Sequence, residues 1–449
     1  MLLGVAHIFG LKFLNFISSA IGIIVLSEPT GTSWREFMKG NVLVLTVSRI
    51  IWSISNSVVF PYVSLYILSL GGSKPTIGLV TAIGNIAGML LFPLGGYIAD
   101  KSGRAKLVGY STILYASSFL FFIFAPSWEW IAVGTAYQMF VQFYMPALNA
   151  IMADSIPVKA RGRVLALTIA VPEAVRILAP YIGGWLIAEY TLGPAMRIGY
   201  TISFVMAGLV AYIRIRYLKE TVKSEPIGRD VIKIFRDSYA TVFTSTQWVI
   251  SNMSGFALVS MLLITFGSLV SPFWVVYGKE VLLINEYAWG TIFLIAGVIK
   301  TIFSIIAGSW IDRIGAKKGL IIGLALSIPN MILFPYAQGY YQALAIYISV
   351  IIANAIIWIS SSVLLANTIP RQMRGRIMAA LGQGISIGVT GGGYAAGFII
   401  FIPMTLGSLA SGYIYDFNPQ LPWLLQSIAI MLGLILTFRL INEPERAEV

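Results

Sequence analysis

The chain has 449 residues, of which 58% are hydrophobic and only 11% are charged, and its formal net charge is +12. So few charged side chains cannot cover the surface of a soluble protein of this length, whereas apolar segments of about 20 residues cross a bilayer. There is no cysteine, one histidine (His7) and no G-x-x-x-x-G-K-[ST] motif, which excludes disulfides, a thiolate or histidine metal centre and that phosphate-binding loop. We therefore expect a multi-pass membrane protein that is not an enzyme and needs no cofactor.

Residues 1–38 form an apolar segment that stands apart from the rest of the chain. His7, Lys12, Asn15 and Ser18 fall within one arc of a helical wheel, which favours an amphipathic helix lying in the membrane interface. The segment is also apolar enough to be an extra span, and Met38 is an alternative start. All three interpretations remain open.

Twelve further segments are long and apolar enough to cross a membrane as helices. They are predicted at residues 41–70, 76–99, 106–126, 130–153, 165–188, 196–216, 246–277, 287–311, 318–337, 340–366, 377–412 and 421–441. The eleventh is unusually long and contains three consecutive glycines, at 391–393. Because glycine weakens a helix, we expect a break near these residues.

Positive charges are distributed unevenly among the connections. Those after the even-numbered segments hold nineteen Lys and Arg residues, against three for the odd-numbered ones with Arg197 counted. Because basic loops stay on the cytoplasmic side, we expect the even-numbered connections and both ends of the twelve-helix core to be cytoplasmic. The basic balance then reflects topology, and we expect no nucleic-acid partner.

The twelve segments repeat as two sets of six. Residues 153–167 resemble 366–380, residues 95–103 resemble 307–315, and Pro61 matches Pro272, all at nearly one offset. Both halves begin on the same side, so the repeat is parallel. The predicted fold is an all-α integral membrane protein whose divisions are 1–38 (N-terminal segment), 39–216 (first six-helix bundle), 217–245 (cytoplasmic loop), 246–442 (second bundle) and 443–449 (cytoplasmic tail).

The repeated loop at 95–103 carries a recognisable motif. The residues Gly96, Asp100, Lys101, Gly103 and Arg104 resemble G-x-x-x-D-[RK]-x-G-R-[RK], the signature of the major facilitator superfamily, with Ala105 at its last position. The second half keeps the matching residues Gly308, Asp312, Arg313 and Gly315. Over residues 40–442, the resemblance implies a secondary transporter that works by alternating access.

The same resemblance implies a gate at the cytoplasmic side. In this family the second helix packs beside the eleventh and the eighth beside the fifth. Asp100 would then meet Arg374 and Arg376, and Asp312 would meet Arg161 and Arg163. A carboxylate is stabilised there by the helix dipole and by the cations. Alternatively, these charges only mark the ends of helices.

Four ionisable residues lie well inside the predicted spans: Arg49, Glu173, Arg176 and Lys300. Each is costly in hydrocarbon and needs a partner or a water-filled cavity. Glu173 can pair with Arg176 three residues away, and, if the fifth and eighth helices are neighbours, with Lys300 across the halves. We hypothesise that Glu173 carries a coupled proton; a static salt bridge is the alternative. Arg49 either binds an anionic substrate group or extends towards the cytoplasm.

By resemblance, the first, fourth, seventh and tenth helices line a central cavity. The polar and aromatic residues expected there are Trp52, Asn56, Tyr137, Gln138, Gln142, Asn252, Asn354 and Trp358. Such a lining suits a partly apolar organic molecule. We interpret Trp274 as an interfacial anchor. Glycines four residues apart, Gly84 with Gly88 and Gly384 with Gly388, predict closely packed helices.

The stretch LAPYIGG at 178–184 resembles the G-P-x-x-G-G segment of proton antiporters in this superfamily, with Ala179 in place of the first glycine. We therefore expect a monomeric carrier in the plasma membrane that exports a small organic solute in exchange for protons. Its partners would be that solute, protons and the lipid bilayer. The alternatives are proton-coupled uptake of a sugar, carboxylate or amino acid, and a transporter-like sensor that moves nothing.

Overall fold

The computed structural model describes residues 38–101, 103–156, 161–222, 231–370, 373–389 and 397–443, so the N-terminal segment 1–37 lies outside the described residues. The helices of the first half are α3 (Gly40–Val59), η1 (Phe60–Tyr62), α4 (Val63–Ser69), α5 (Lys74–Lys101), α6 (Arg104–Ile123), α7 (Trp128–Val141), η2 (Gln142–Tyr144), α8 (Met145–Ser155), α9 (Arg161–Arg176), α10 (Ala179–Tyr190) and α11 (Leu192–Tyr217). Those of the second half, with α12 (Val231–Asn252) before them, are α13 (Ser254–Val270), α14 (Trp274–Glu280), α15 (Glu286–Ile314), α16 (Ala316–Leu333), η4 (Phe334–Tyr336), α17 (Gly339–Thr368), α18 (Arg374–Leu381), α19 (Phe398–Phe417) and α20 (Leu421–Leu440).

The described helices follow the twelve predicted segments. Ten helical stretches within the described residues are long and apolar enough to cross a membrane. The fourth and fifth segments correspond to α7–η2–α8 and α9–α10, each of which is interrupted in the middle. The predicted all-helical membrane fold, with two halves of six spans, is confirmed.

Prolines coincide with the interruptions in four of the spans. Pro61 lies in η1, Pro272 lies between α13 and α14, and Pro146 and Pro180 lie in the first turns of α8 and α10. Proline lacks the N–H of a helical hydrogen bond and clashes with the preceding turn. Because Pro61 and Pro272 match across the sequence repeat, the two halves are interrupted at corresponding positions.

The structure differs from the sequence-based boundaries in two places. Helix α12 begins at Val231, inside the stretch expected to be a loop until 245. The eleventh span is split into α18 and α19, and its backbone leaves the helix at Gly382, where φ is +95°, and stays non-helical to 389. The residues 391–393, where a break was expected, lie outside the described residues. Gly384 and Gly388 therefore do not form a helix-packing face, and Gly388 has a φ of +77°, which favours glycine.

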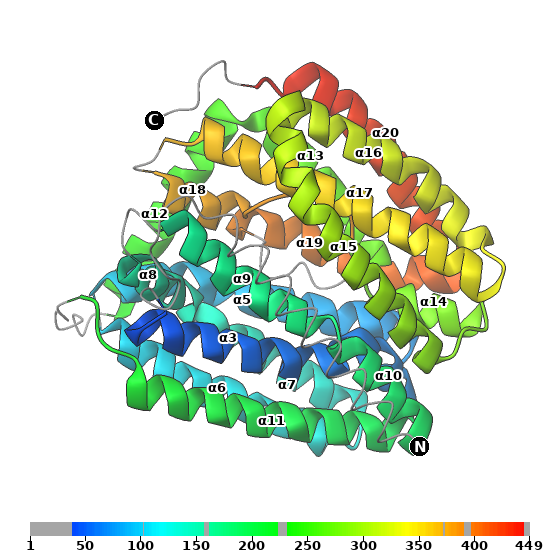
Figure 1. The fold of residues 1–449 in the computed structure, drawn as a ribbon, viewed down its shortest axis with the longest axis horizontal. Helices are drawn as coiled ribbons and strands as arrows, with labels where there is room; N and C mark the ends of the chain where they lie inside the picture. Colours follow the sequence, from blue (N-terminus) through cyan, green and yellow to red (C-terminus); the bar gives the residue numbers. More distant parts are fainter. Residues whose placement is uncertain are drawn as a thin grey trace.

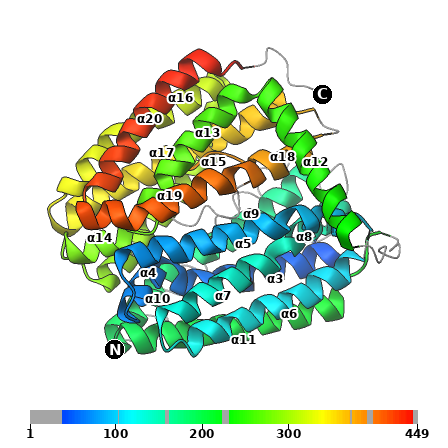
Figure 2. The same ribbon diagram turned by 180° about the vertical axis from the view of Figure 1, so that it is seen from behind.

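The two halves form a wedge (Figures 1 and 2). In Figure 1 they converge at the right, near α10 and α14, and diverge towards the left, near α8 and α18. We call the divergent end, which carries Arg104, Arg216 and Arg313, the basic end, and the convergent one the opposite end. Helix α12 packs against α5 and α18 and so connects the halves at the basic end, where the Tyr239 hydroxyl donates to the Leu90 carbonyl at 2.9 Å.

Close contacts join the halves at the opposite end. Helix α5 packs on α19 and α10 packs on α15, which are the neighbours that the resemblance implied. A Cβ atom at Gly78 would overlap the carbonyl oxygen of Ser408, so only glycine lets α5 and α19 approach this closely. Lys74 and Glu280 form an ion pair of 2.5 Å between the halves. The opposite end is therefore closed.

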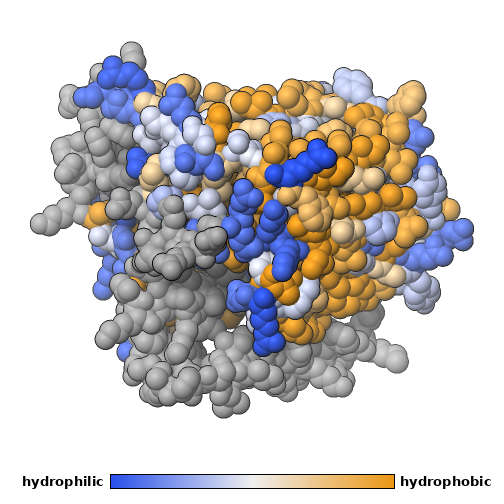
Figure 3. Space-filling model, turned by 90° about the horizontal axis from the view of Figure 1, so that it is seen from above, coloured by the Kyte–Doolittle hydropathy of each residue, from blue (hydrophilic) through white to orange (hydrophobic). Residues whose placement is uncertain are grey.

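The outer surface suits contact with lipid. Figure 3 shows apolar side chains over the centre and right of one face, with hydrophilic residues at the right-hand edge, at the upper left and in a group near the middle. On α20, Leu432, Ile435 and Phe438 are about half exposed. A soluble protein would leave few such side chains in contact with water, whereas a membrane protein places them against hydrocarbon.

Candidate transport pathway

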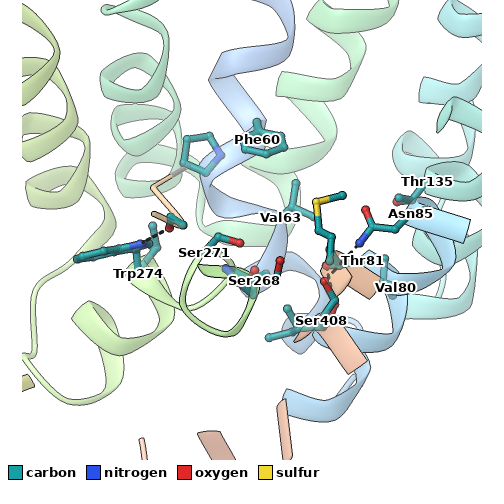
Figure 4. A pocket seen from close by; sticks show the side chains of 18 of the residues that line it. Phe60, Val63, Val80, Thr81, Asn85, Thr135, Ser268, Ser271, Trp274 and Ser408 are labelled. Carbon is teal, nitrogen blue, oxygen red and sulfur yellow. Dashed lines mark hydrogen bonds between the residues drawn. The ribbon is translucent and has the colours of Figure 1, made fainter. Parts of the chain in front are cut away.

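A cavity of about 250 Å³ lies between the two halves. The first half contributes residues of α3 to α7 and of α11. The second contributes residues of α13, α14, α15, α17 and α19 together with part of the non-helical stretch 382–389. Figure 4 shows side chains from both halves facing this space. Because both halves supply its walls, a change in their relative position must change its shape.

The cavity wall is apolar and aromatic with neutral polar groups. Among the described residues that line it, none is acidic or basic. Phe119, Phe122 and Trp358 offer ring surfaces, and the Asn85 amide donates to the Ser408 hydroxyl at 3.4 Å across the halves (Figure 4). Such a wall can stack against an organic molecule and hydrogen-bond to it without supplying charge.

Side chains of neighbouring helices hold the non-helical stretch 382–389. The backbone N–H of Ile385 donates to the Ser361 hydroxyl at 2.9 Å, and that of Ile387 donates to Asn354 Oδ1 at 3.1 Å. These bonds take the place of the hydrogen bonds that a helix would provide. Backbone polar groups at membrane depth need such partners because no water is available there. Since Gly384, Ser386, Gly388 and Val389 line the cavity, the stretch brings main-chain groups to the transport pathway.

Trp274 is part of this wall, and its interpretation as an interfacial anchor is wrong. Its side chain is 1% exposed and packs edge-on against the rings of Phe334, Tyr347 and Trp423. The indole Nε1 donates to the Gly388 carbonyl oxygen at 3.0 Å. Because that bond satisfies the only polar group of the indole, the ring can be buried.

The other residues expected in the cavity are divided among several places. Asn56, Gln138 and Trp358 line it. Trp52 and Tyr137 instead turn into the first half, where the Trp52 ring lies 4.3 Å from that of Tyr115.

The remaining three amides have local roles. Gln142 is 9% exposed and donates to Met139 Sδ at 3.5 Å. Asn252 is exposed at the end of α12, and Asn354 holds the stretch 382–389. The sequence shows which residues of a helix are polar, but it does not show how that helix is rotated about its own axis.

The intramembrane charges form a cluster between α9 and α15. Glu173 Oε2 and Arg176 Nη2 are 2.6 Å apart, and both side chains are nearly half exposed. Lys300, on α15 of the other half, is partly buried and interacts electrostatically with both. The described side chains show no direct Glu173–Lys300 ion pair, so Glu173 bonds within its own helix and attracts Lys300 at longer range.

Arg49 has a different partner from these three residues. It is half-buried, and its Nη2 donates to Asn149 Oδ1 at 3.3 Å, which links α3 to α8.

Much of the predicted gate falls on residues that are not described. The side chains of Asp100, Lys101, Arg161 and Arg163, and the surroundings of Gly96, lie outside the described residues. Gly103 precedes the first residue of α6, and Asp312, Arg313 and Arg376 are exposed.

Two gate arginines have partners within their own half. Arg104 Nη1 lies 2.6 Å from Asp154 Oδ2. Arg374 donates to the carbonyl oxygens of Ala366 and Ile369, at 2.5 and 3.3 Å, and so satisfies acceptors at the end of α17.

Comparison with known proteins agrees with this architecture. The sequence profile of the Major Facilitator Superfamily matches residues 45–280 and again residues 256–449. Multidrug resistance protein MdtG of Salmonella paratyphi C (strain RKS4594) is 24% identical over 397 residues, which cover 85% of this chain and 95% of that protein. A Na(+), Li(+), K(+)/H(+) antiporter of Planococcus maritimus is 23% identical over 389 residues, covering 79% of this chain and 87% of that protein.

Solved structures share the fold at lower identity. The nucleoside transporter NupG is 17% identical with a TM-score of 0.65, covering 89% of this chain and 98% of that one. A D-xylose-proton symporter is 15% identical with a TM-score of 0.63, covering 92% of this chain and 99% of that one. With a profile match in each half and a cavity between the halves, the chain belongs to the Major Facilitator Superfamily and is a secondary transporter of the membrane, not an enzyme.

Proposed function

We propose that the chain is a monomeric proton-coupled antiporter that exports a small organic solute across the cell membrane. Two relatives support this direction, since one is named a multidrug resistance protein and the other a cation/proton antiporter. The antiporter-like stretch 178–184 includes the break between α9 and α10, and Gly183 and Gly184 lie against backbone carbonyls of α3 and α15. The neutral, aromatic cavity suits a partly apolar solute.

The distribution of basic residues supports an orientation with the basic end in the cytoplasm. In that orientation the wedge of Figure 1 opens to the cytoplasm, and its opposite end is closed. An exported solute would enter the cavity in this state. The reverse tilt of the two halves would then expose it to the outside.

The observation that carries the proposal is the cluster of Glu173, Arg176 and Lys300 between the halves. While Glu173 is ionised, its negative charge offsets the repulsion between Arg176 and Lys300, so α9 and α15 can come together and close the basic end. A proton on Glu173 removes that charge and leaves two cations facing each other. Proton uptake from outside would therefore favour opening to the cytoplasm, which is the order that antiport requires.

Proton movement in proteoliposomes tests the proposal. Organic cations, anions and neutral compounds are added to wild type and to Glu173→Gln. The matched control is Glu189→Gln, which removes an exposed carboxylate on α10, the other part of the same span. We expect compound-driven proton flux in wild type and Glu189→Gln, and none in Glu173→Gln.

Two results would contradict the proposal in different ways. Flux that survives in Glu173→Gln would reduce the cluster to a static salt bridge. Compound transport without any proton movement in wild type would exclude proton coupling while leaving a transporter.

A further inference from the structure

We propose that Arg49 and Arg214 form a binding site for a small anionic group, of the size of a carboxylate or a halide, inside the first half. The site lies among α3, α6, α11 and the junction of η2 with α8. No ion pair or hydrogen bond among the described residues joins it to the charge cluster of Glu173, and binding there requires neither proton coupling nor export.

Arg214 is a buried cation whose contacts are all neutral. Its side chain is 3% exposed, its Nη1 donates to the Thr112 hydroxyl at 2.8 Å, and its Nε has no hydrogen-bond partner. The guanidinium lies 5.7 Å from the centroid of the Trp52 ring and 6.0 Å from that of Tyr144. Ring faces stabilise a cation, but they do not neutralise it.

Arg49 approaches the same place from α3. It stands one turn before Trp52 on α3, the ring on which Arg214 lies, and its partner Asn149 follows Tyr144 along the next helix. The two guanidinium groups repel each other electrostatically. Asn149 is exposed, so the front of the site is open, whereas Arg214 forms its closed back.

Within the described residues, the site has two cations and no counter-charge. Two other arginines of this half do have carboxylate partners, since Arg104 pairs with Asp154 and Arg176 with Glu173. Among the described residues, no carboxylate oxygen lies within ion-pair distance of Arg49 or Arg214.

Two neighbouring like charges, one of them on a side chain that is 3% exposed, need compensation. An anion between the guanidinium groups would supply it, and it would accept the bond that Arg214 Nε does not make.

Equilibrium binding to the purified full-length chain in detergent tests the site. The probes are sodium chloride, sodium acetate and sodium benzoate, with ionic strength held constant by sodium sulfate, whose anion is larger and divalent and carries no carboxylate. Binding is followed by thermal unfolding and by tryptophan fluorescence, because Trp52 lies against Arg214. The variants are Arg49→Gln, Arg214→Gln and the matched control Arg216→Gln, an exposed arginine two residues along α11. Arg214→Lys replaces the glutamine variant if that one does not fold.

We expect saturable binding in wild type and Arg216→Gln, weakened by about tenfold or more in Arg49→Gln and in the Arg214 variant, because a charge-assisted bond is lost. Trp52→Phe should lose the fluorescence change and keep the thermal shift. Binding of chloride and acetate alike supports a site for free anions, and binding of acetate and benzoate alone supports a carboxylate carried by an organic solute. No saturable response in wild type, or equal affinity in Arg49→Gln and Arg216→Gln, would overturn the site whether or not proton flux is found.

Discussion

Asn354 is the side chain on which the non-helical part of the eleventh span depends most directly. Its Oδ1 accepts from both the Ser386 hydroxyl and the backbone N–H of Ile387, each at 3.1 Å. A buried donor that loses its acceptor costs about 1–3 kcal/mol. Both donors belong to residues beside the cavity wall, so the cavity depends on this amide.

Replacing Asn354 by Leu should lower the unfolding temperature by a few degrees and weaken solute binding, because two donors lose their acceptor. Asn252→Leu is the control, since that amide is exposed and donates only to the Trp248 carbonyl of its own helix. Thermal unfolding in detergent measures both variants. Equal unfolding temperatures for the two would show that the stretch 382–389 does not need Asn354.

Side-chain roles were only partly predictable from the sequence. The family resemblance, which implied the lining helices, and the residue types together selected Asn56, Gln138 and Trp358, and these three residues line the cavity between the halves. The same criteria selected Trp52, which packs on Tyr115 inside the first half. The difference lies in the rotation of each helix, which is set by packing against neighbours far apart in the sequence.

Helices α5 and α19 form the most direct contact between the halves at the opposite end. Gly78 lies against the Ser408 carbonyl and Gly412 against the Lys74 carbonyl, so backbone meets backbone on both sides. Neither contact has a flexible side chain that could give way to an added methyl group.

Gly78→Val should therefore open this end. Overpacking costs about 1–3 kcal/mol, which shifts a two-state equilibrium by roughly tenfold or more. The chain contains no cysteine, so a single cysteine can be introduced in place of the cavity residue Asn56. Its reaction with an impermeant thiol reagent added outside measures how accessible the cavity is from that side. We expect faster labelling with Gly78→Val than with the control Gly208→Val, whose site has open space. Equal labelling would mean that this contact does not limit opening.

At the scale of elements, hydrophobic length and proline positions predicted the spans well. They failed where tertiary contacts decide the backbone. The non-helical stretch 382–389 is stabilised by Ser361, Asn354 and Trp274, which belong to other helices. The glycines of the eleventh segment therefore indicate that a break exists, but they do not locate it. Helix α12 includes Lys233 and Arg236 and is too polar for a span, so the criterion of apolar length does not detect it.

In the whole molecule, each half supplies one wall of the central cavity. The halves are in contact at the opposite end and diverge at the basic end. The sequence repeat predicted the two halves, but not which end is closed, because a transporter with two states uses the same sequence for both. A proton on Glu173 is the proposed switch between them, with the basic end favoured open when that carboxyl is neutral.

Alternating access requires the two ends to move in opposite senses, and paired distance measurements test this most directly. Spin labels are attached to cysteines at Arg216 and Lys318 at the basic end, and separately at Tyr190 and Tyr341 at the opposite end, all exposed positions in a chain without cysteine. For wild type in acidic buffer, and for Glu173→Gln, we expect the distance between the labels at the basic end to lengthen and the distance between the labels at the opposite end to shorten. For wild type in alkaline buffer, we expect both changes to be reversed. Distances that stay fixed, or that change in the same sense at both ends, would contradict alternating access driven by this carboxyl.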